Sequence, residues 1–330
     1  MRQKKRDHFY PQHTVSNFRM NKALFDIPVL LIVHNRPETT CHVFDQIRKI
    51  RPAQLYIFSD AAKEGKLGDA DLIETCRCLL EDSQINWECK VERWYPTSNM
   101  GWAIGVSSAI TWAFETSEKL IILQDDCLPN PTFFTFCKTM LEKYNANERV
   151  MHVSGTCWDE KVEPMDTDHS FSLIGHVWGW ATWKRAWSKY DVWMEQLPEM
   201  KIKNKLQGLF GDSQMVKYWH DRFDKVHEQL TKSTWDYQWQ YTLFENYGVA
   251  AVPNVNLVSN IGFERSNFGV HLPEHYISET TEWQAMPGNV QMSVDNTYEQ
   301  LYAKRRTHSK PGLRSRIVRK FRQMLQSDFR

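Results

Sequence analysis

A continuous apolar run that ends in two adjacent carboxylates constrains this chain more than any other feature. Leu120–Leu123 is entirely apolar, and Asp125 and Asp126 follow it after a single glutamine. Such a run predicts a strand buried on both faces of a parallel sheet, which requires helices on both sides. Pro129 and Pro131 prevent the strand from continuing. The sequence therefore predicts an α/β fold with acidic side chains at the end of a central strand.

The two carboxylates are candidates for a metal site. In open α/β sheets, ligands bind beyond the carboxyl ends of the strands. Adjacent carboxylates repel each other unless a cation lies between them and the ligand, and oxygen ligands favour a hard divalent ion such as Mg²⁺ or Mn²⁺. A solvated turn containing Asp125 and Asp126 is the alternative, and the pair by itself favours the metal site only slightly.

Composition excludes several classes of protein. The chain has 330 residues, of which 42% are hydrophobic, enough for one large core or two small ones. A net charge of +1 argues against a nucleic-acid-binding protein. No apolar run approaches the roughly 20 residues of a membrane span, and no signal-peptide core follows the basic residues 1–10. The seven cysteines lack zinc-site spacing and indicate free thiols in a reducing compartment, so we expect a cytoplasmic protein.

Strands and helices alternate through the first half of the chain, which is the order of βαβ units. The predicted strands cover 28–33, 55–58, 87–94, 120–123 and 150–154, and the predicted helices cover 38–49, 71–80, 102–116 and 131–144. Residues 1–25 precede this pattern without clear periodicity and are expected to form an N-terminal arm. Polar residues stand at or just beyond the strand ends, namely Arg36, Asp60, Asp125 and Asp126.

A turn at Asn99–Gly101 precedes the helix predicted for 102–116. The free amide N–H groups and positive dipole of such a helix N-terminus are suited to a pyrophosphate. The spacing is not that of a known phosphate-binding or dinucleotide-binding loop, so a plain connection is the alternative.

The second half is rich in aromatic residues. Trp180, Trp183 and Trp187 have helical spacing, which predicts a helix buried through its aromatic face. Trp178 and Trp180 flank a glycine and offer flat surfaces of the kind that stack against sugar rings, and both interpretations are open. Residues 191–232 predict helices, 235–244 a helix, and 249–252 and 256–259 short strands.

The order of these segments resembles nucleotide-sugar glycosyltransferases of the GT-A fold, and in particular the N-acetylglucosaminyltransferase I type and its bacterial relatives. The resemblance spans roughly residues 27–272. It rests on Leu30–Pro37, Gln124–Asp126 with Pro129–Phe134 behind it, Val153–Ser154, Trp178–Trp180 and Trp235–Asp236. Such enzymes often have a glutamate where this chain has Gln124, so one carboxylate fewer would lie near the sugar.

The resemblance implies a role for each acidic or basic residue. Arg36 would contact the nucleotide, and Asp60 would accept a hydrogen bond from the uracil or ribose. Asp126 would hold Mn²⁺ or Mg²⁺ against the diphosphate, and Asp125 would touch ribose or sugar hydroxyls. Asp236, in the first turn of its predicted helix, would be the general base that removes the proton of the acceptor hydroxyl. A helix cap is the alternative for Asp236.

Further residues complete the expected site. Asn99, Gly101, Gln124 and Trp180 are expected to contact the nucleotide-sugar, and His271 stands where many bacterial relatives place a histidine near the metal or diphosphate.

We therefore expect a metal-dependent inverting glycosyltransferase of polysaccharide biosynthesis. One GT-A domain over 26–308 would contain a nucleotide-binding half, 26–154, and an acceptor half, 155–308. It would move a hexosyl or N-acetylhexosaminyl group from a UDP-sugar to a saccharide or lipid-linked saccharide. The alternatives are a sugar nucleotidyltransferase, for which a Gly-rich loop after the first strand is missing, and a non-catalytic carbohydrate-binding protein, which the Trp content favours.

The C-terminal tail, residues 309–330, predicts a basic amphipathic helix. Its apolar face consists of Leu313, Ile317, Phe321, Met324 and Leu325, and arginine and lysine surround that face. Such a segment suits an anionic membrane surface, so we expect peripheral association with the inner face of the membrane. A solvated helix or an oligomer contact is the alternative.

Overall fold

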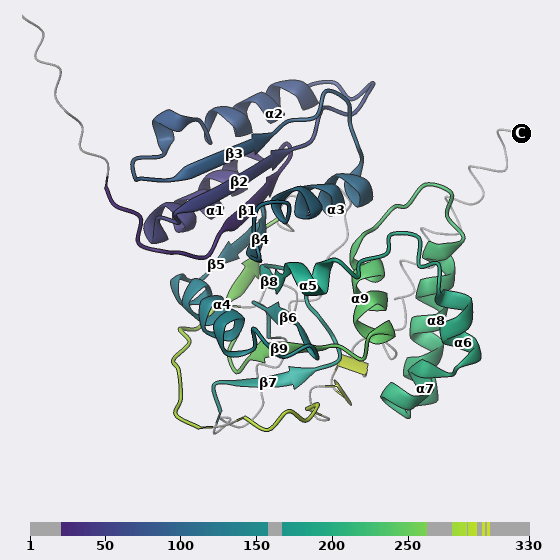
Figure 1. The fold of residues 1–330 in the computed structure, drawn as a ribbon. Coiled ribbons are helices and arrows are strands. Elements are labelled where there is room, and N and C mark those ends of the chain that lie inside the picture. Colours follow the sequence, from purple (N-terminus) through teal and green to yellow (C-terminus); the bar gives the residue numbers. More distant parts are fainter. Residues whose placement is uncertain are drawn as a thin grey trace, which may run out of the picture.

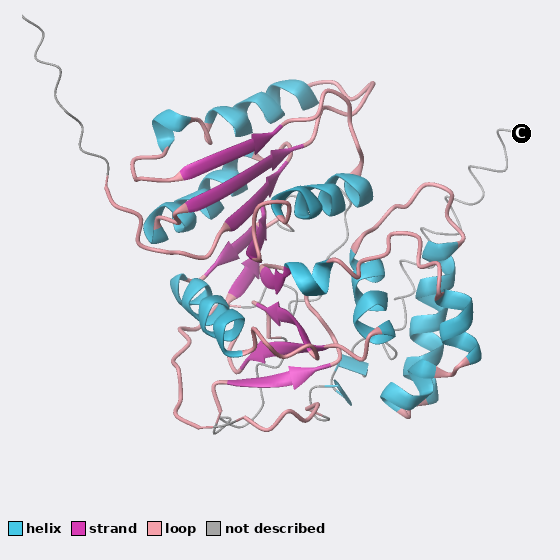
Figure 2. Cartoon of the chain, viewed as in Figure 1, coloured by secondary structure: helices cyan, strands magenta, loops and turns pink. Residues whose placement is uncertain are grey.

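The structure, a computed structural model, describes residues 21–157, 167–262, 279–288, 290–295, 299–300 and 302–303. These residues form an eight-stranded sheet with helices on both faces (Figures 1 and 2). The predicted class, an α/β fold with a mostly parallel sheet flanked by helices, is confirmed.

The strands of the sheet are β1 (Val29–Val33), β2 (Gln54–Ser59), β3 (Lys90–Trp94), β4 (Lys119–Gln124), β6 (Val150–Ser154), β7 (His169–Ser172), β8 (Trp180–Trp183) and β9 (Val249–Pro253). A separate pair consists of β5 (Cys127–Pro129) and β10 (Val258–Asn260). The helices are α1 (Pro37–Ile50), α2 (Asp69–Cys78), α3 (Trp102–Ala113), α4 (Pro131–Lys143), α5 (Lys184–Trp187), α6 (Leu197–Ile202), α7 (Lys205–Phe210), α8 (Ser213–His227), α9 (Asp236–Glu245) and the short 3₁₀ helix η1 (Asp82–Gln84).

The strand order is β3-β2-β1-β4-β8-β6-β9-β7. The first four strands in this order are parallel, as are β6 and β9. By contrast, β8 runs antiparallel between β4 and β6, and β7 runs antiparallel to β9 at one edge. The carboxyl ends of β1, β2 and β4 therefore lie at the same edge of the sheet, where the polar residues predicted from the sequence follow each strand.

Alternation along the strands produces two hydrophobic cores, one on each face of the sheet. Leu31 of β1 belongs to the core that is covered by α1 and α4, whereas Leu30 and Ile32 belong to the core covered by α3 and α9. Because every residue of β1 is buried, its sequence shows no polar position, as expected for an inner strand of a covered sheet.

Helix α1 extends the predicted range, 38–49, by one residue at each end. Pro37 occupies its first turn, where a missing N–H costs nothing, and Val43, Phe44 and Ile47 form the buried face. The helix ends at Ile50, and the next residue, Arg51, takes a left-handed conformation (φ 48°) and donates its N–H to the carbonyl of Ile47. Arg36 therefore lies at the N-terminus of α1, directly beyond β1.

The helix predicted for the tryptophan segment is wrong over its first half. Residues Trp180–Trp183 form β8, and only the four residues Lys184–Trp187 are helical. A buried strand between two others sends alternate side chains to opposite faces, so Trp180 enters one core and Trp183 the other. The helical spacing was coincidental, since pairing with β4 and β6 decides the conformation.

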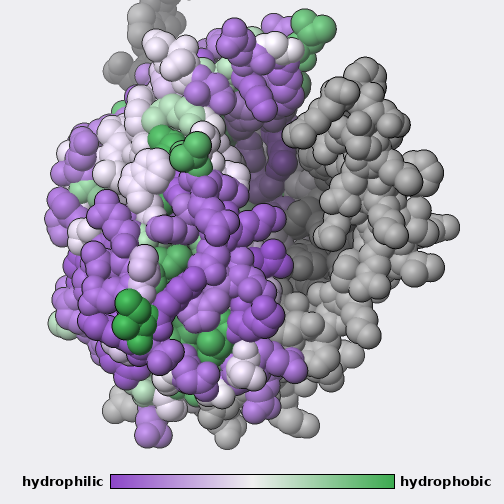
Figure 3. All heavy atoms as spheres, turned by 90° about the vertical axis from the view of Figure 1, so that its right-hand side faces the viewer, coloured by the Kyte–Doolittle hydropathy of each residue, from purple (hydrophilic) through white to green (hydrophobic). Residues whose placement is uncertain are grey.

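Helices α6 to α9 form a group beside the sheet (Figure 1), and the helical prediction for 191–232 is confirmed. Trp219 and Phe223 of α8 pack against Phe244 of α9 with ring centroids 5.1 and 6.0 Å apart. The part of this side that is visible in Figure 3 is mainly hydrophilic, with hydrophobic residues in small separate groups.

Several expectations fall at or beyond the limits of the described chain. Residues 21–25 lie against the sheet, because Asn21 forms a bridge with Trp87 and Phe25 one with Pro52. Residues 1–20, His271 and the tail from 309 lie outside the described residues.

All seven cysteines are free thiols. Within the described ranges, no helix is long and apolar enough to cross a membrane.

Candidate functional site

A cavity of about 640 Å³ lies beyond the carboxyl ends of β1, β2 and β4. Its wall contains seven of the residues predicted from the sequence, namely Arg36, Asp60, Asn99, Gly101, Gln124, Asp125 and Asp126. These residues come from four separate segments of the chain. The topology brings them together because the parallel strands that precede three of the segments end at the same edge.

Asp125 is held in the cavity wall by hydrogen bonds to β1 and to the residue directly after it. Its backbone N–H bonds to the carbonyl of Ile32 (3.0 Å), and its side-chain Oδ2 accepts the backbone N–H of His34 (2.9 Å). The side chain is almost fully buried, and burial together with the negative charge of Asp126 raises the pKa of Asp125 to about 7. A positive charge bound beside this pair would stabilise both carboxylates.

Asp126 forms an ion pair with Arg36 across the cavity. The backbone of Gly262 passes close to this pair, since a Cβ at Gly262 would lie 2.4 Å from Asp126 Oδ2 and 2.7 Å from Arg36 Nη1. A side chain at Gly262 would therefore displace the ion pair.

Asp60 has a different environment from the one expected. Its Oδ1 accepts the N–H groups of Ala61 (2.8 Å) and Met100 (2.9 Å). Its Oδ2 accepts the N–H of Gly101 (3.1 Å) and the side-chain amide of Asn99 (3.2 Å). Because the chain itself supplies these donors, we assign Asp60 to shaping the turn before α3 rather than to direct contact with a ligand. The same bonds occupy the N–H of Gly101 that a pyrophosphate would have used.

The acidic residues fit a divalent cation in part. Asp125 and Asp126 supply two carboxylates, and Asn260 and Gln124 place amide groups on the same wall. No group of three or more His, Cys, Asp or Glu side chains suited to a metal occurs among the described residues. The ion would therefore need phosphate and water oxygens to complete its shell, as Mg²⁺ commonly does in nucleotide sites. His271 lies outside the described residues.

The expectation for Trp180 needs correction. Its side chain is fully buried, stacked on His152 at 4.9 Å and on Trp235 at 5.8 Å between ring centroids. No face of this ring is available to a sugar. Trp178, two residues earlier, lines the cavity instead, because Gly179 takes a left-handed conformation (φ 62°) between the two tryptophans.

Asp236 is the first residue of α9 and does not line the cavity that contains the carboxylate pair. It accepts a hydrogen bond from the hydroxyl of Thr234 and lines a second, smaller cavity of about 120 Å³. Trp178 lines both cavities and is therefore a shared wall. His176 and Tyr237 also line the smaller cavity.

Other residues of the larger cavity were not singled out from the sequence. They include His34, Asn35, Lys63, Lys66, Trp102 and Asn260. Trp102 is the first residue of α3 and is 53% exposed, which is unusual for tryptophan. Two signals were present in the sequence, namely a large aromatic residue directly after the Asn99–Gly101 turn, and a repeated Lys-x-Gly spacing at 63–68.

Comparison with known proteins shows only distant similarity. No family model matches the sequence, and no match is found among curated proteins. The chain is similar in structure to the inositol-1-phosphate CTP transferase from T. maritima, with 9% identity, a TM-score of 0.34, and 69% of this chain and 85% of that chain covered. It is also similar to the glycosyltransferase GlyE from Streptococcus pneumoniae TIGR4, with 10% identity, a TM-score of 0.32, and coverage of 68% and 45%.

A third similar structure is the 4-diphosphocytidyl-2C-methyl-D-erythritol synthase from Anaerococcus prevotii DSM 20548, with 10% identity, a TM-score of 0.32, and coverage of 69% and 88%. Likeness at this level gives no information about activity.

Proposed function

We propose that this protein is a metal-dependent glycosyltransferase that transfers a sugar from a UDP-sugar to a saccharide or lipid-linked saccharide with inversion at the anomeric carbon. The observation that carries the proposal is the cavity beyond β1, β2 and β4, where a carboxylate pair, an arginine and an exposed tryptophan face one space. The arginine suits the phosphates of a nucleotide, the tryptophan suits its planar base, and the carboxylates suit its hydroxyl groups or a bound cation.

The nucleotide would lie between Trp102, the first residue of α3, and the carboxylate pair Asp125 and Asp126. Trp102 offers an aromatic face to the base. Arg36 is half-exposed and would donate to a phosphate oxygen, since a guanidinium binds phosphate in two-point contacts. Asp125, held by the N–H of His34, would accept from a ribose or sugar hydroxyl.

Asp126 and Asp125 would hold a divalent ion, Mn²⁺ or Mg²⁺. When bound, such an ion neutralises the charge that develops on the diphosphate leaving group. The pair with Arg36 shows that Asp126 already faces a positive charge in this cavity.

The acceptor would enter on the side of Asp236. Its hydroxyl oxygen would attack the anomeric carbon while the bond from that carbon to the diphosphate oxygen breaks and the electron pair leaves with UDP. The hydroxyl proton would pass to the carboxylate of Asp236. The single displacement inverts the configuration, and Trp178, which lines both cavities, would lie beside the sugar.

The first experiment measures thermal stabilisation of the protein by UDP with and without Mn²⁺. A ligand that binds only the folded state stabilises it by RT ln(1 + [L]/Kd) and so raises the melting temperature. If UDP binding depends on the metal, the melting temperature should rise only when UDP and Mn²⁺ are both present. A screen of nucleotide sugars for metal-dependent hydrolysis then identifies the donor.

Two results would point elsewhere. Release of pyrophosphate from a nucleoside triphosphate and a sugar 1-phosphate would identify a sugar nucleotidyltransferase. Stabilisation by saccharides but not by UDP would identify a carbohydrate-binding protein, and the proposal would then be abandoned.

A further inference from the structure

The 61–69 loop, which joins β2 to α2 and includes the first residue of α2, forms one wall of the cavity through two consecutive turns. Lys66 N–H bonds to the carbonyl of Lys63 (3.1 Å), and Asp69 N–H bonds to the carbonyl of Lys66 (3.4 Å). Gly65 (φ 75°) and Gly68 (φ 74°) occupy the third position of each turn, where a positive φ favours glycine. The repeated Lys-x-Gly sequence thus builds two similar turns, each of which starts with a lysine on the cavity wall.

Asp69 ties this loop to the segment that follows β1. Its side chain is fully buried and accepts hydrogen bonds from the backbone N–H of Lys63 (3.0 Å) and the side-chain amide of Asn35 (2.5 Å). It also pairs with the ammonium of Lys66 at 2.8 Å, and the ring of His34 lies 3.6 Å away. One carboxylate therefore contacts four residues that line the cavity.

Asp69 is ionised, because the hydrogen-bond donors around it favour the carboxylate form. Burial by itself would raise the pKa of Asp69, but the donors from Lys66, Lys63 and Asn35 outweigh it and hold the pKa at about 2. The carboxylate is thus ionised at every pH at which the protein would be used.

The positive charges on the wall differ in whether they are already paired. Arg36 faces Asp126, and Lys66 faces Asp69. Lys63 is exposed, and its ammonium has no hydrogen-bond or ion-pair partner among the described residues. Among the described residues, no side chain or carbonyl pairs with the positive charge of Lys63, which is therefore available to a ligand in the cavity.

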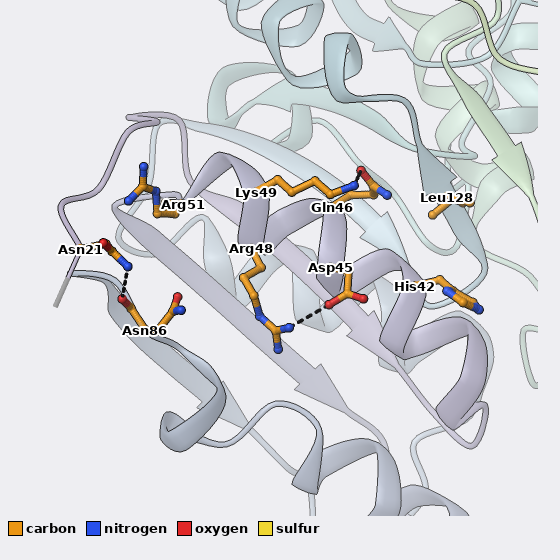
Figure 4. A pocket seen from close by; sticks show the side chains of 9 residues that line it. All are labelled: Asn21, His42, Asp45, Gln46, Arg48, Lys49, Arg51, Asn86 and Leu128. Atoms are coloured by element: carbon orange, nitrogen blue, oxygen red, sulfur yellow. Dashed lines mark hydrogen bonds and ion pairs between the residues drawn. The ribbon is translucent and has the colours of Figure 1, made fainter. Parts of the chain in front are cut away.

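A second basic groove, lined by residues of α1 and by Asn21, Arg51, Asn86 and Leu128, shows the contrast (Figure 4). There Arg48 bonds to Asp45 at 2.8 Å and Lys49 to Gln46 at 3.2 Å, so neighbours on the same helix occupy both side chains. Lys49 is exposed, like Lys63, and provides a matched control.

We propose that Lys63 binds the phosphate groups of the nucleotide ligand and that Asp69 is a positioning residue that holds the 61–69 loop so that Lys63 faces them. This inference rests on the proposed function only in that the ligand carries phosphate. It assigns to the loop a part in ligand binding that is separate from the carboxylate pair.

The test compares the affinities of UDP and uridine, measured by calorimetry at saturating Mn²⁺, in the wild type and in variants. Lys63→Ala should weaken UDP binding about tenfold, the effect of losing one charged hydrogen bond, and leave uridine binding unchanged. The dependence of UDP affinity on salt should become shallower, because one phosphate contact is lost. Lys49→Ala should behave as the wild type in each measurement.

Asp69→Asn tests the positioning role. Asparagine has one side-chain oxygen in place of two, so its N–H₂ group would face either the donors from Asn35 and Lys66 or the N–H of Lys63, and the loop would lose part of its anchor. UDP affinity should fall at least as much as in Lys63→Ala, and adding Lys63→Ala to Asp69→Asn should cause little further loss. Fully additive losses would contradict the positioning role.

The outcomes separate this inference from the proposed function. A wild type that does not bind UDP would refute the proposed function itself. A wild type that binds UDP, with Lys63→Ala binding it equally well and with the same salt dependence, would overturn this inference alone. Equal loss of UDP and uridine binding in Lys63→Ala would also overturn it, since a phosphate contact cannot affect uridine.

Discussion

We expect the stability of this protein to fall in mild acid because of one buried histidine. His152, on β6, is completely buried and stacks on Trp180. Its Nδ1 accepts the indole N–H of Trp239 at 3.0 Å, and since an indole nitrogen can only donate, Nδ1 carries no proton. Nε2 therefore carries it and donates to the carbonyl of His176 at 3.0 Å. A second proton on Nδ1 would face the N–H of Trp239.

The magnitude follows from the pKa. Burial lowers the pKa of His152 from 6.5 to about 3, so the unfolded chain binds a proton on this residue at a higher pH than the folded chain does. The stabilisation is complete above pH 6.5 and is lost as the pH falls towards the folded-state pKa. The loss from pH 8 to pH 5 is about 2 kcal/mol, and the limit in strong acid is about 5 kcal/mol.

The assay is urea unfolding followed by tryptophan fluorescence at pH 8 and pH 5, in the wild type and in His152→Asn. Asparagine retains an acceptor for Trp239 but leaves the carbonyl of His176 unbonded, so at pH 8 the variant should be roughly 1–3 kcal/mol less stable. At pH 5 this gap should narrow by about 2 kcal/mol, because the variant has no group to protonate at this site.

Other titrating groups cancel in this comparison, since both proteins contain them. Burial raises the pKa of Glu299 to about 7, for example, which acts in the opposite direction in both. The control is His42→Asn, because His42 is exposed on α1 and its replacement disturbs no buried contact. A gap between wild type and His152→Asn that is the same at pH 8 and pH 5 would refute the reasoning.

The other predictions concern the proposed activity. Asp126→Ala should abolish Mn²⁺-dependent UDP binding with little change in melting temperature, because its half-exposed partner Arg36 can turn to water; UDP binding at wild-type affinity in calorimetry would show that the assignment is wrong. Asp236→Asn should retain UDP affinity and lose sugar transfer, since the amide cannot take a proton, whereas equal loss of both would indicate a structural cap. Deletion of residues 310–330 should release the protein from anionic vesicles in a sedimentation assay without loss of donor hydrolysis, and binding by the full chain should weaken as salt rises; unchanged vesicle binding would exclude the membrane role.

The sequence determined the order of the elements in the first half of the chain. Each strand there is a short apolar run bounded by turn residues, and each helix has a local apolar periodicity, so the information lies within a few neighbouring residues. The start of α1 at Pro37 and the place of Asp125 beyond β4 follow from such signals. Residues at the ends of parallel strands must meet, so the sequence also indicated most of the cavity.

The tertiary structure decided what depends on contacts between distant segments. The spacing of Trp180, Trp183 and Trp187 predicts a helix, but pairing with β4 and β6 makes Trp180 part of a strand. Apart from the N–H of Ala61, the donors to Asp60 come from residues 99–101, and no local pattern around Asp60 predicts them. Asp69 likewise has one partner in its own loop, Lys63, and another after β1, Asn35, which is remote in the sequence. Periodicity is a local property, whereas the partners of a buried polar group are chosen by the topology that brings remote loops together.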